Sequence, residues 1–146
     1  MTLSLRIGLA VLALMELVLG VWTSLFPENF YRDVPTVNLT PPYSEHLFRD
    51  FGGATLGLAI VLGAAAIWPT TRLVVIALLA YLAFSAPHLV FHLGHLHDAT
   101  AIEASLLTVA LTATVILPLA LIAVATIRAR RARDGLSAPR ATPEPQ

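Results

Sequence analysis

The histidines of the 88–97 segment are the residues of this sequence best suited to chemistry. His88, His92 and His95 follow one another at spacings of four and three residues, which places them on one face of a helix. Two imidazoles at positions i and i+4 can share one metal ion, and imidazole combined with carboxylate suits zinc, copper or iron. The spacing therefore predicts a metal site with His88 and His92 among its ligands.

A metal ion at this face needs further ligands, because zinc usually has four protein ligands, or three and a water molecule. His46 and Asp50 stand four residues apart at the start of another apolar segment. The predicted metal ligands are therefore His46, Asp50, His88 and His92. A haem held by His46 with His88 or His92 is a less favoured alternative, since bis-histidine ligation in a bundle needs histidines from different helices.

Other polar side chains suit a small lipophilic ligand with a polar headgroup. Tyr81 and Ser85 continue the histidine stripe inward at spacings of four and three, and Glu16 lies within an apolar run. A lone carboxylate at membrane depth is protonated, paired or functional. Arg49 would balance negative charge or bind an anionic headgroup. The predicted ligand-binding residues are Glu16, Arg49, Tyr81 and Ser85.

The elements that must position these side chains are membrane-spanning helices. The chain has 146 residues, of which 57% are hydrophobic and 12% are charged, whereas a soluble domain has about a quarter charged residues. A spanning helix needs about 20 apolar residues, and four segments meet this condition, at about 3–26, 47–68, 73–93 and 101–127. The sequence therefore predicts an all-α fold, a bundle of four transmembrane helices within residues 1–127.

The placement of arginine predicts how the bundle lies in the membrane. Five of the nine arginines stand at or beyond Arg128, directly after the last apolar segment, and arginine-rich segments stay on the cytoplasmic side. With four spans, both chain ends are then cytoplasmic, and segment 27–46 forms an outer loop with aromatic rings at headgroup level. We expect residues 128–146 to form a basic, disordered cytoplasmic tail.

Helical spacing predicts that the polar groups converge in the outer half of the bundle. Glu16 shares one face of its helix with Gly20, and Asp50 shares one face with Gly53 and with the glycine four residues further on. Glycines four residues apart let a neighbouring helix approach closely. If the polar faces point toward one axis, Glu16, Asp50 and His88 meet near a common point.

Two charged groups also have structural explanations. The segment from Thr100 to Glu103 fits the T-x-x-E pattern of a capping box at the start of the last helix. Arg49 is expected to pair across a helix interface with Glu16 or Glu103, because buried charges are usually paired.

Other interpretations of the polar cluster stay open. The chain can be a non-enzymatic accessory or assembly subunit of a membrane complex, or a homo-oligomer, whose polar groups only lock helix packing. It can also be an enzyme acting on a lipid or quinone, with His88 and Asp50 as acid and base and Ser85 as the available nucleophile. We favour a non-catalytic role. The absence of cysteine excludes disulfides and thiolate sites, and nucleic-acid binding is not expected, since the basic cluster adjoins a membrane helix.

Two short motifs carry a resemblance to known proteins. They are EHLFRDFGG, from Glu45 to Gly53, and PHLVFHLGHL, from Pro87 to Leu96. The chain resembles a group of small actinobacterial four-helix membrane proteins of unknown function, which are loosely similar to DoxX-like proteins. The resemblance covers about residues 3–127. It implies a four-helix bundle in the bacterial plasma membrane, and it brings no established activity and no assigned catalytic residues.

Overall fold

The protein is built almost entirely from helices. The computed structural model describes residues 3–39 and 42–137. In these residues it contains no strand, and its elements are α1 (Leu3–Leu25), α2 (Pro27–Asp33), the 3₁₀ helix η1 (Val37–Leu39), α3 (Glu45–Ile67), α4 (Thr71–Leu93) and α5 (Ala101–Ser137). Four of them, α1, α3, α4 and α5, are long and apolar enough to cross a membrane. The predicted all-α bundle of four long apolar helices is confirmed.

The helix ends agree with the predicted segments except at the C-terminal side of α5. This helix continues past Ile127 to Ser137, through a stretch that we expected to be disordered. Arginine ends an apolar span, but arginine and alanine are both strong helix formers and do not end a helix. Residues 138–146 of the predicted tail lie outside the described part of the chain.

Polar side chains define where the later helices begin. The hydroxyls of Ser44 and Thr70 accept hydrogen bonds from the amides three residues on, which caps α3 and α4. At α5 the amide of Glu103 donates to Thr100 Oγ1 (3.3 Å), and the amide of Thr100 donates to Glu103 Oε2 (2.9 Å). This reciprocal pair confirms the predicted capping box.

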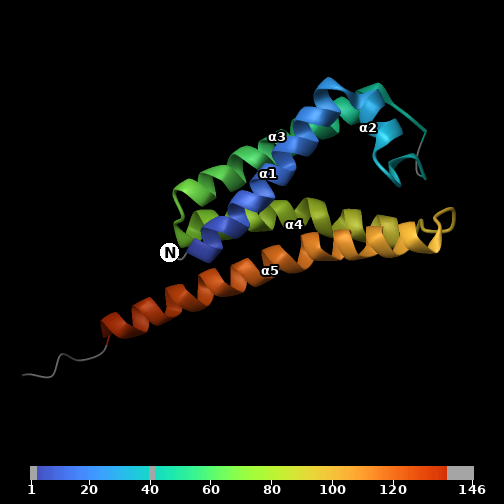
Figure 1. Ribbon diagram of the computed structural model, residues 1–146. Coiled ribbons are helices and arrows are strands. Elements are labelled where there is room, and N and C mark those ends of the chain that lie inside the picture. Colours follow the sequence, from blue (N-terminus) through green and yellow to red (C-terminus); the bar gives the residue numbers. More distant parts are fainter. Residues whose placement is uncertain (1–2, 40–41, 138–146) are drawn as a thin grey trace, which may run out of the picture.

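The long helices associate as two pairs. Figure 1 shows α1 lying along α3, and α4 lying along α5, and these pairings have the most extensive contacts in the fold. A Cβ atom added at Gly20 would lie 2.9 Å from the backbone nitrogen of Leu56, and one added at Gly52 would lie 2.8 Å from that of Ser24. The two glycines therefore allow α1 and α3 to touch backbone to backbone.

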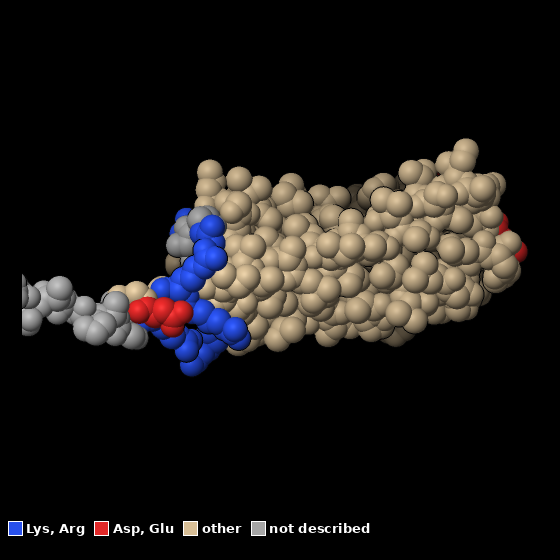
Figure 2. Space-filling model, turned by 90° about the horizontal axis from the view of Figure 1, so that it is seen from below, with Lys and Arg blue, Asp and Glu red and all other residues tan. Residues whose placement is uncertain are grey.

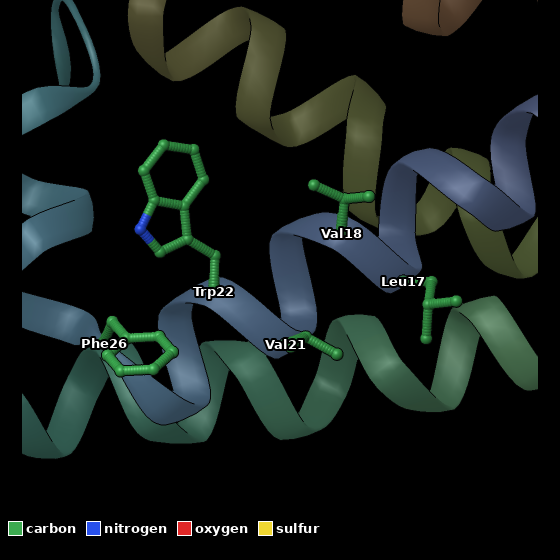
Figure 3. Close-up of a pocket in the computed structure, with 5 residues that line it drawn as sticks. All are labelled: Leu17, Val18, Val21, Trp22 and Phe26. Carbon is green, nitrogen blue, oxygen red and sulfur yellow. The ribbon is translucent and has the colours of Figure 1, made fainter.

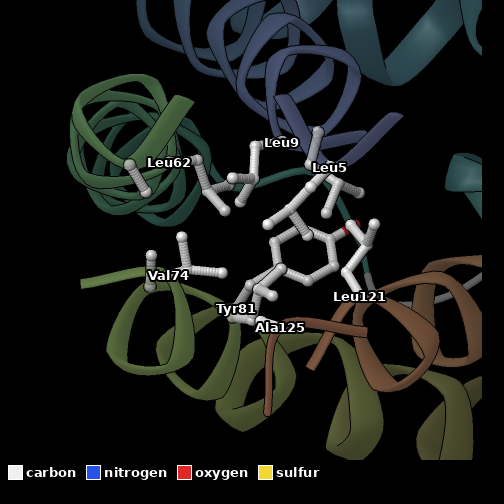
Figure 4. Packing of buried hydrophobic residues seen from close by; sticks show 11 residues of the cluster. Leu5, Leu9, Leu62, Val74, Tyr81, Leu121 and Ala125 are labelled. Carbon is white, nitrogen blue, oxygen red and sulfur yellow. The ribbon is translucent and has the colours of Figure 1, made fainter. Parts of the chain in front are cut away.

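The buried core lies toward one end of the bundle. It is a single cluster to which all four long helices contribute, shown in Figure 4 around the ring of Tyr81. Its members are Leu5, Leu9, Leu12, Leu62, Ala65, Val74, Ala77, Leu78, Tyr81, Leu121 and Ala125. From this end the α1–α3 pair and the α4–α5 pair diverge, as Figure 1 shows. The two pairs are thus joined at the end where the chain starts and α5 finishes.

The same end carries most of the positive charge. We call it the arginine end, because Arg6, Arg72, Arg128, Arg130, Arg131 and Arg133 lie there, on the termini of α1, α4 and α5. Figure 2 shows arginine side chains gathered at one end of a mostly uncharged surface, with acidic side chains beside them and at the far end. The opposite end, which we call the loop end, carries α2, η1 and the 94–100 connection. The arginine end is the one that the sequence predicts to be cytoplasmic.

We predict that a membrane-impermeant maleimide added to intact cells will label an Asn29→Cys variant and will not label an Asp134→Cys variant. Both side chains are exposed, and they lie at opposite ends of the bundle. The chain has no cysteine of its own, so each variant carries one reactive thiol. Both should react in permeabilised cells, which is the control. Equal labelling of the two variants in intact cells would contradict the orientation.

Candidate ligand site

The polar stripe of α4 forms one wall of the candidate site. Tyr81 and Ser85 are buried, with 1% and 2% of their surface exposed, while His88 and His92 are half-buried. The rings of His88 and His92 lie 4.6 Å apart, edge to face. Beyond them His95 is exposed, and its Nδ1 lies 2.7 Å from the carbonyl oxygen of Phe91. The stripe therefore runs from the buried core to the surface of the loop end.

Glu16 faces the same region from α1. Only 1% of its surface is exposed, although it carries a carboxyl group. It lies close enough to Tyr81 to interact with it electrostatically. Among the described residues, Glu16 Oε2 and Ser85 Oγ are the buried side-chain polar atoms without a hydrogen-bond partner. A buried polar group without a partner costs about 1–3 kcal/mol, and a charged group costs more. Tyr81 interacts electrostatically with Glu16 and stands one helical turn before Ser85 on α4, so the two unpartnered atoms belong to the same part of the bundle.

The neighbouring buried polar groups are satisfied, which sets Glu16 and Ser85 apart. The hydroxyl of Thr23 donates to the carbonyl of Leu19 (2.7 Å), and that of Thr55 donates to the carbonyl of Gly52 (3.0 Å). Sequence reasoning did not single out Thr55, which lies three residues after Gly52 on the face that packs against α1. The small residues Gly20 of α1 and Gly52 of α3 would have predicted this contact face, since a Cβ atom added at Gly20 would lie 2.8 Å from Thr55 Oγ1.

The outer face of α3 does not take part in the site. His46 and Asp50 pair with each other at 3.2 Å, and their side chains are 88% and 65% exposed. Gly53 is exposed as well, and a Cβ atom added there would meet nothing within 4 Å. The expected convergence of Asp50 with Glu16 and His88 is therefore not found. The reason is helical phase, because Gly52, one residue earlier than Gly53, faces α1 and turns the Asp50 face away.

Arg49 also has partners other than those expected. Its guanidinium pairs with Glu45 at 2.8 Å and donates a hydrogen bond to the carbonyl of Ser24, near the C-terminal end of α1. A cation at this position complements the negative end of the helix. Glu16 and Glu103 are not its partners, so Arg49 ties α3 to α1 at the loop end and lies outside the Glu16–Ser85 region.

Aromatic rings link the site to α3. The rings of Phe51 and Phe84 lie 5.7 Å apart, and Phe84 stacks on His88 at 5.3 Å. With His92 they make a continuous ladder of rings between α3 and the half of α4 nearer the loop end. Flat apolar faces of this kind suit the apolar part of a ligand.

A comparison with known proteins assigns the chain to a family. Residues 4–90 match the family described as domain of unknown function DUF4345. The chain belongs to this family. No curated protein and no solved structure matches it. The DUF4345 segment runs from α1 into α4, so that it includes Glu16, Ser85 and His88, while α5 lies beyond it.

The described residues of this DUF4345 protein do not assemble a multidentate metal site. No group of three or more histidine, aspartate or glutamate side chains in residues 3–39 and 42–137 is placed to hold a metal ion. His88 and His92 supply two imidazoles from one helix, and zinc typically takes three or four protein ligands. His46 is exposed on α3 and pairs with Asp50.

A shallow apolar hollow of about 380 Å³ lies on the opposite side of α1 from Glu16. Figure 3 shows its lining residues, Leu17, Val18, Val21, Trp22 and Phe26, all on or next to α1. In this DUF4345 chain the hollow contains no charged side chain. It is open and lined by apolar side chains, and it does not belong to the polar site.

Proposed function

We propose that this protein binds a small lipophilic molecule with a polar headgroup in the outer half of the bacterial plasma membrane. The headgroup would lie beside Glu16 and Ser85, with His88 and His92 as further hydrogen-bond partners on the side of the loop end. Tyr81 would form the floor, and the apolar part of the ligand would lie along the Phe84 and His88 rings. The role of the protein would be binding, without a catalytic step.

The observation that carries the proposal is the pair of unpartnered atoms, Glu16 Oε2 and Ser85 Oγ. They come from different helices, α1 and α4, and both residues are almost fully buried. Buried polar groups are nearly always hydrogen-bonded in native proteins. Ionisable groups at membrane depth usually face a bundle interior and mark a functional site. A ligand with a hydroxyl or carbonyl group would supply the missing partners.

Access to this place from the bilayer is consistent with the way the helices pair. The core that joins the two pairs ends near Leu12 and Tyr81, and the pairs diverge beyond it (Figure 1). Across this outer part the ring contact between Phe51 and Phe84 joins α3 to α4. A lipophilic molecule would enter between the pairs from the outer leaflet and meet the carboxyl group at the bottom.

A lipophilic ligand is favoured over a transition metal because of the donors that come together. The region offers the carboxyl group of Glu16 on α1 and, on α4, the hydroxyl group of Ser85 and the imidazoles of His88 and His92. His46 and Asp50 pair with each other on the exposed face of α3. Hydroxyl and imidazole groups suit hydrogen bonding to a neutral polar headgroup. Zinc, copper or iron at His88 and His92 remains a distinct outcome of the experiment below.

The proposal predicts that the protein purified in mild detergent carries one lipophilic compound in near-stoichiometric amount, identified by extraction and mass spectrometry. The amount of this compound that co-purifies with a Glu16→Gln/Ser85→Ala double variant should be lower by about tenfold or more, since each lost hydrogen bond to a buried group costs about 1–3 kcal/mol. Asp50→Asn is the matched control, because it neutralises an exposed carboxylate of the same helix bundle and should leave occupancy unchanged.

Elemental analysis of the same samples separates the alternatives. If the wild type contains stoichiometric metal and the His88→Ala/His92→Ala variant does not, the ligand is a metal ion and not a lipophile. Identical extracts from the wild type and the Glu16→Gln/Ser85→Ala variant would rule the ligand site out and leave the polar cluster as a packing device.

A further inference from the structure

The arginine end carries a ring of positive charge that the proposed ligand site does not use. Arginines from three helix ends form it: Arg6 at the start of α1, Arg72 at the start of α4, and Arg128, Arg130, Arg131 and Arg133 on α5. All six are exposed, and Figure 2 shows them together at one end. The described residues of this end include one carboxylate, Asp134, against the six guanidinium groups.

The arginines of the two ends differ in their partners. At the loop end, Arg32 pairs with Asp33 at 2.7 Å and Arg49 pairs with Glu45 at 2.8 Å. The guanidinium of Arg32 lowers the pKa of the Asp33 carboxyl below its usual value, through the hydrogen bond between them. At the arginine end, by contrast, Arg6, Arg72, Arg128, Arg130 and Arg131 make no ion pair within residues 3–39 and 42–137. Their charge is left for a partner outside the chain.

The depth of the ring matches the level of lipid headgroups. The apolar part of α5 ends at Ile127, and Arg128 follows directly. Helix α5 is 37 residues long, about 55 Å at 1.5 Å per residue, whereas the hydrocarbon core is about 30 Å thick. Its last turns therefore extend beyond the apolar layer, and the arginines begin where the polar headgroups must lie.

We propose that this arginine ring binds the phosphodiester groups of anionic phospholipids in the cytoplasmic leaflet. The chain contains arginine and no lysine, and the planar guanidinium donates two parallel hydrogen bonds to a phosphate. The arginines lie on the ends of three different helices at one end of the bundle, which fits a sheet of headgroups better than an acidic protein docked on one side. Basic side chains beside a membrane span contribute about 1 kcal/mol each to attraction by anionic lipid.

The test is lipid binding by native mass spectrometry of the full chain, with phosphatidylglycerol and phosphatidylcholine as the competing probes. The wild type should prefer phosphatidylglycerol by at least about tenfold at low salt, and the preference should fall at high salt because exposed charges are screened. Arg130→Gln should lower the preference roughly fivefold, and an Arg128→Gln/Arg130→Gln/Arg131→Gln variant should nearly abolish it. Arg32→Gln, which removes a paired arginine at the other end, is the matched control and should leave the preference unchanged.

Two further measurements keep the proposal separate from folding and from the ligand site. The thermal unfolding midpoint of each variant shows whether it is folded, and the salt dependence of the wild type needs no variant. A Glu16→Gln variant should keep the lipid preference in full. The proposal would be overturned if the wild type showed no preference for phosphatidylglycerol, or if Arg32→Gln and Arg130→Gln lost the preference equally. Equal competition by soluble glycerol phosphate would overturn it as well.

Discussion

Replacing Gly52 with alanine should destabilise the bundle by about 1–3 kcal/mol, the usual cost of adding a methyl group to a tightly packed interface. The added Cβ atom would lie 2.7 Å from Thr23 Oγ1 and 2.8 Å from the backbone nitrogen of Ser24. A backbone atom cannot move aside as a flexible side chain can, so α1 and α3 must separate. Unfolding of the purified protein by titration with a denaturing detergent measures the effect.

Gly53→Ala is the matched control for this change. The two glycines are neighbours on α3, but nothing lies within 4 Å of a Cβ atom at Gly53. Alanine is a better helix former than glycine by about 1 kcal/mol, so this substitution should leave stability unchanged or raise it slightly. If Gly52→Ala and Gly53→Ala have the same effect, the close contact between α1 and α3 does not pass through Gly52.

This pair of glycines also shows where sequence-based prediction reached its limit. The spacing of Gly53 and Gly57 predicted a close helix contact, and a close contact through a glycine of α3 exists, but it uses Gly52. Successive residues of a helix differ by about 100° in direction. A shift of one residue therefore turned the His46 and Asp50 face from the expected site to the exterior, and the expected meeting of Asp50 with Glu16 and His88 failed with it.

The features that were predicted correctly depend on strong local signals. Long apolar runs define the four helices, because no other structure satisfies the backbone of an isolated span in lipid, and the T-x-x-E pattern defined the start of α5. The stripe of Tyr81, Ser85, His88 and His92 lies on one helix, so that its spacing alone placed it. What the sequence left open was which faces of different helices meet, since many packings bury the same apolar area.

Replacing Phe30 with alanine should have the largest effect at the loop end. The ring of Phe30, 6% exposed, contacts Trp22 of α1 at 5.4 Å and Phe48 of α3 at 6.0 Å, and thereby holds α2 against both helices. Truncation of a buried phenylalanine typically costs 3–5 kcal/mol. Here we expect about 3 kcal/mol, the lower end of this range, because the neighbouring Trp22 and Phe48 are only partly buried. The detergent titration used for Gly52→Ala measures the loss.

Phe26→Ala is the control for this change. The Phe26 ring lies only four residues away and is 58% exposed, so its removal should lower stability little.

Trp22 fluorescence offers a second, local measurement. It is made in a Trp68→Phe background, which removes the other tryptophan, itself 65% exposed. Phe30→Ala should shift the emission of Trp22 toward longer wavelength, because the indole loses an apolar neighbour and gains water. Helix α2 contacts α1 and α3 but has no contacts with α4 or α5. Its release should therefore leave ligand occupancy of the Glu16–Ser85 site unchanged. A loss of ligand in Phe30→Ala equal to that in Glu16→Gln/Ser85→Ala would instead make the loop end part of the site.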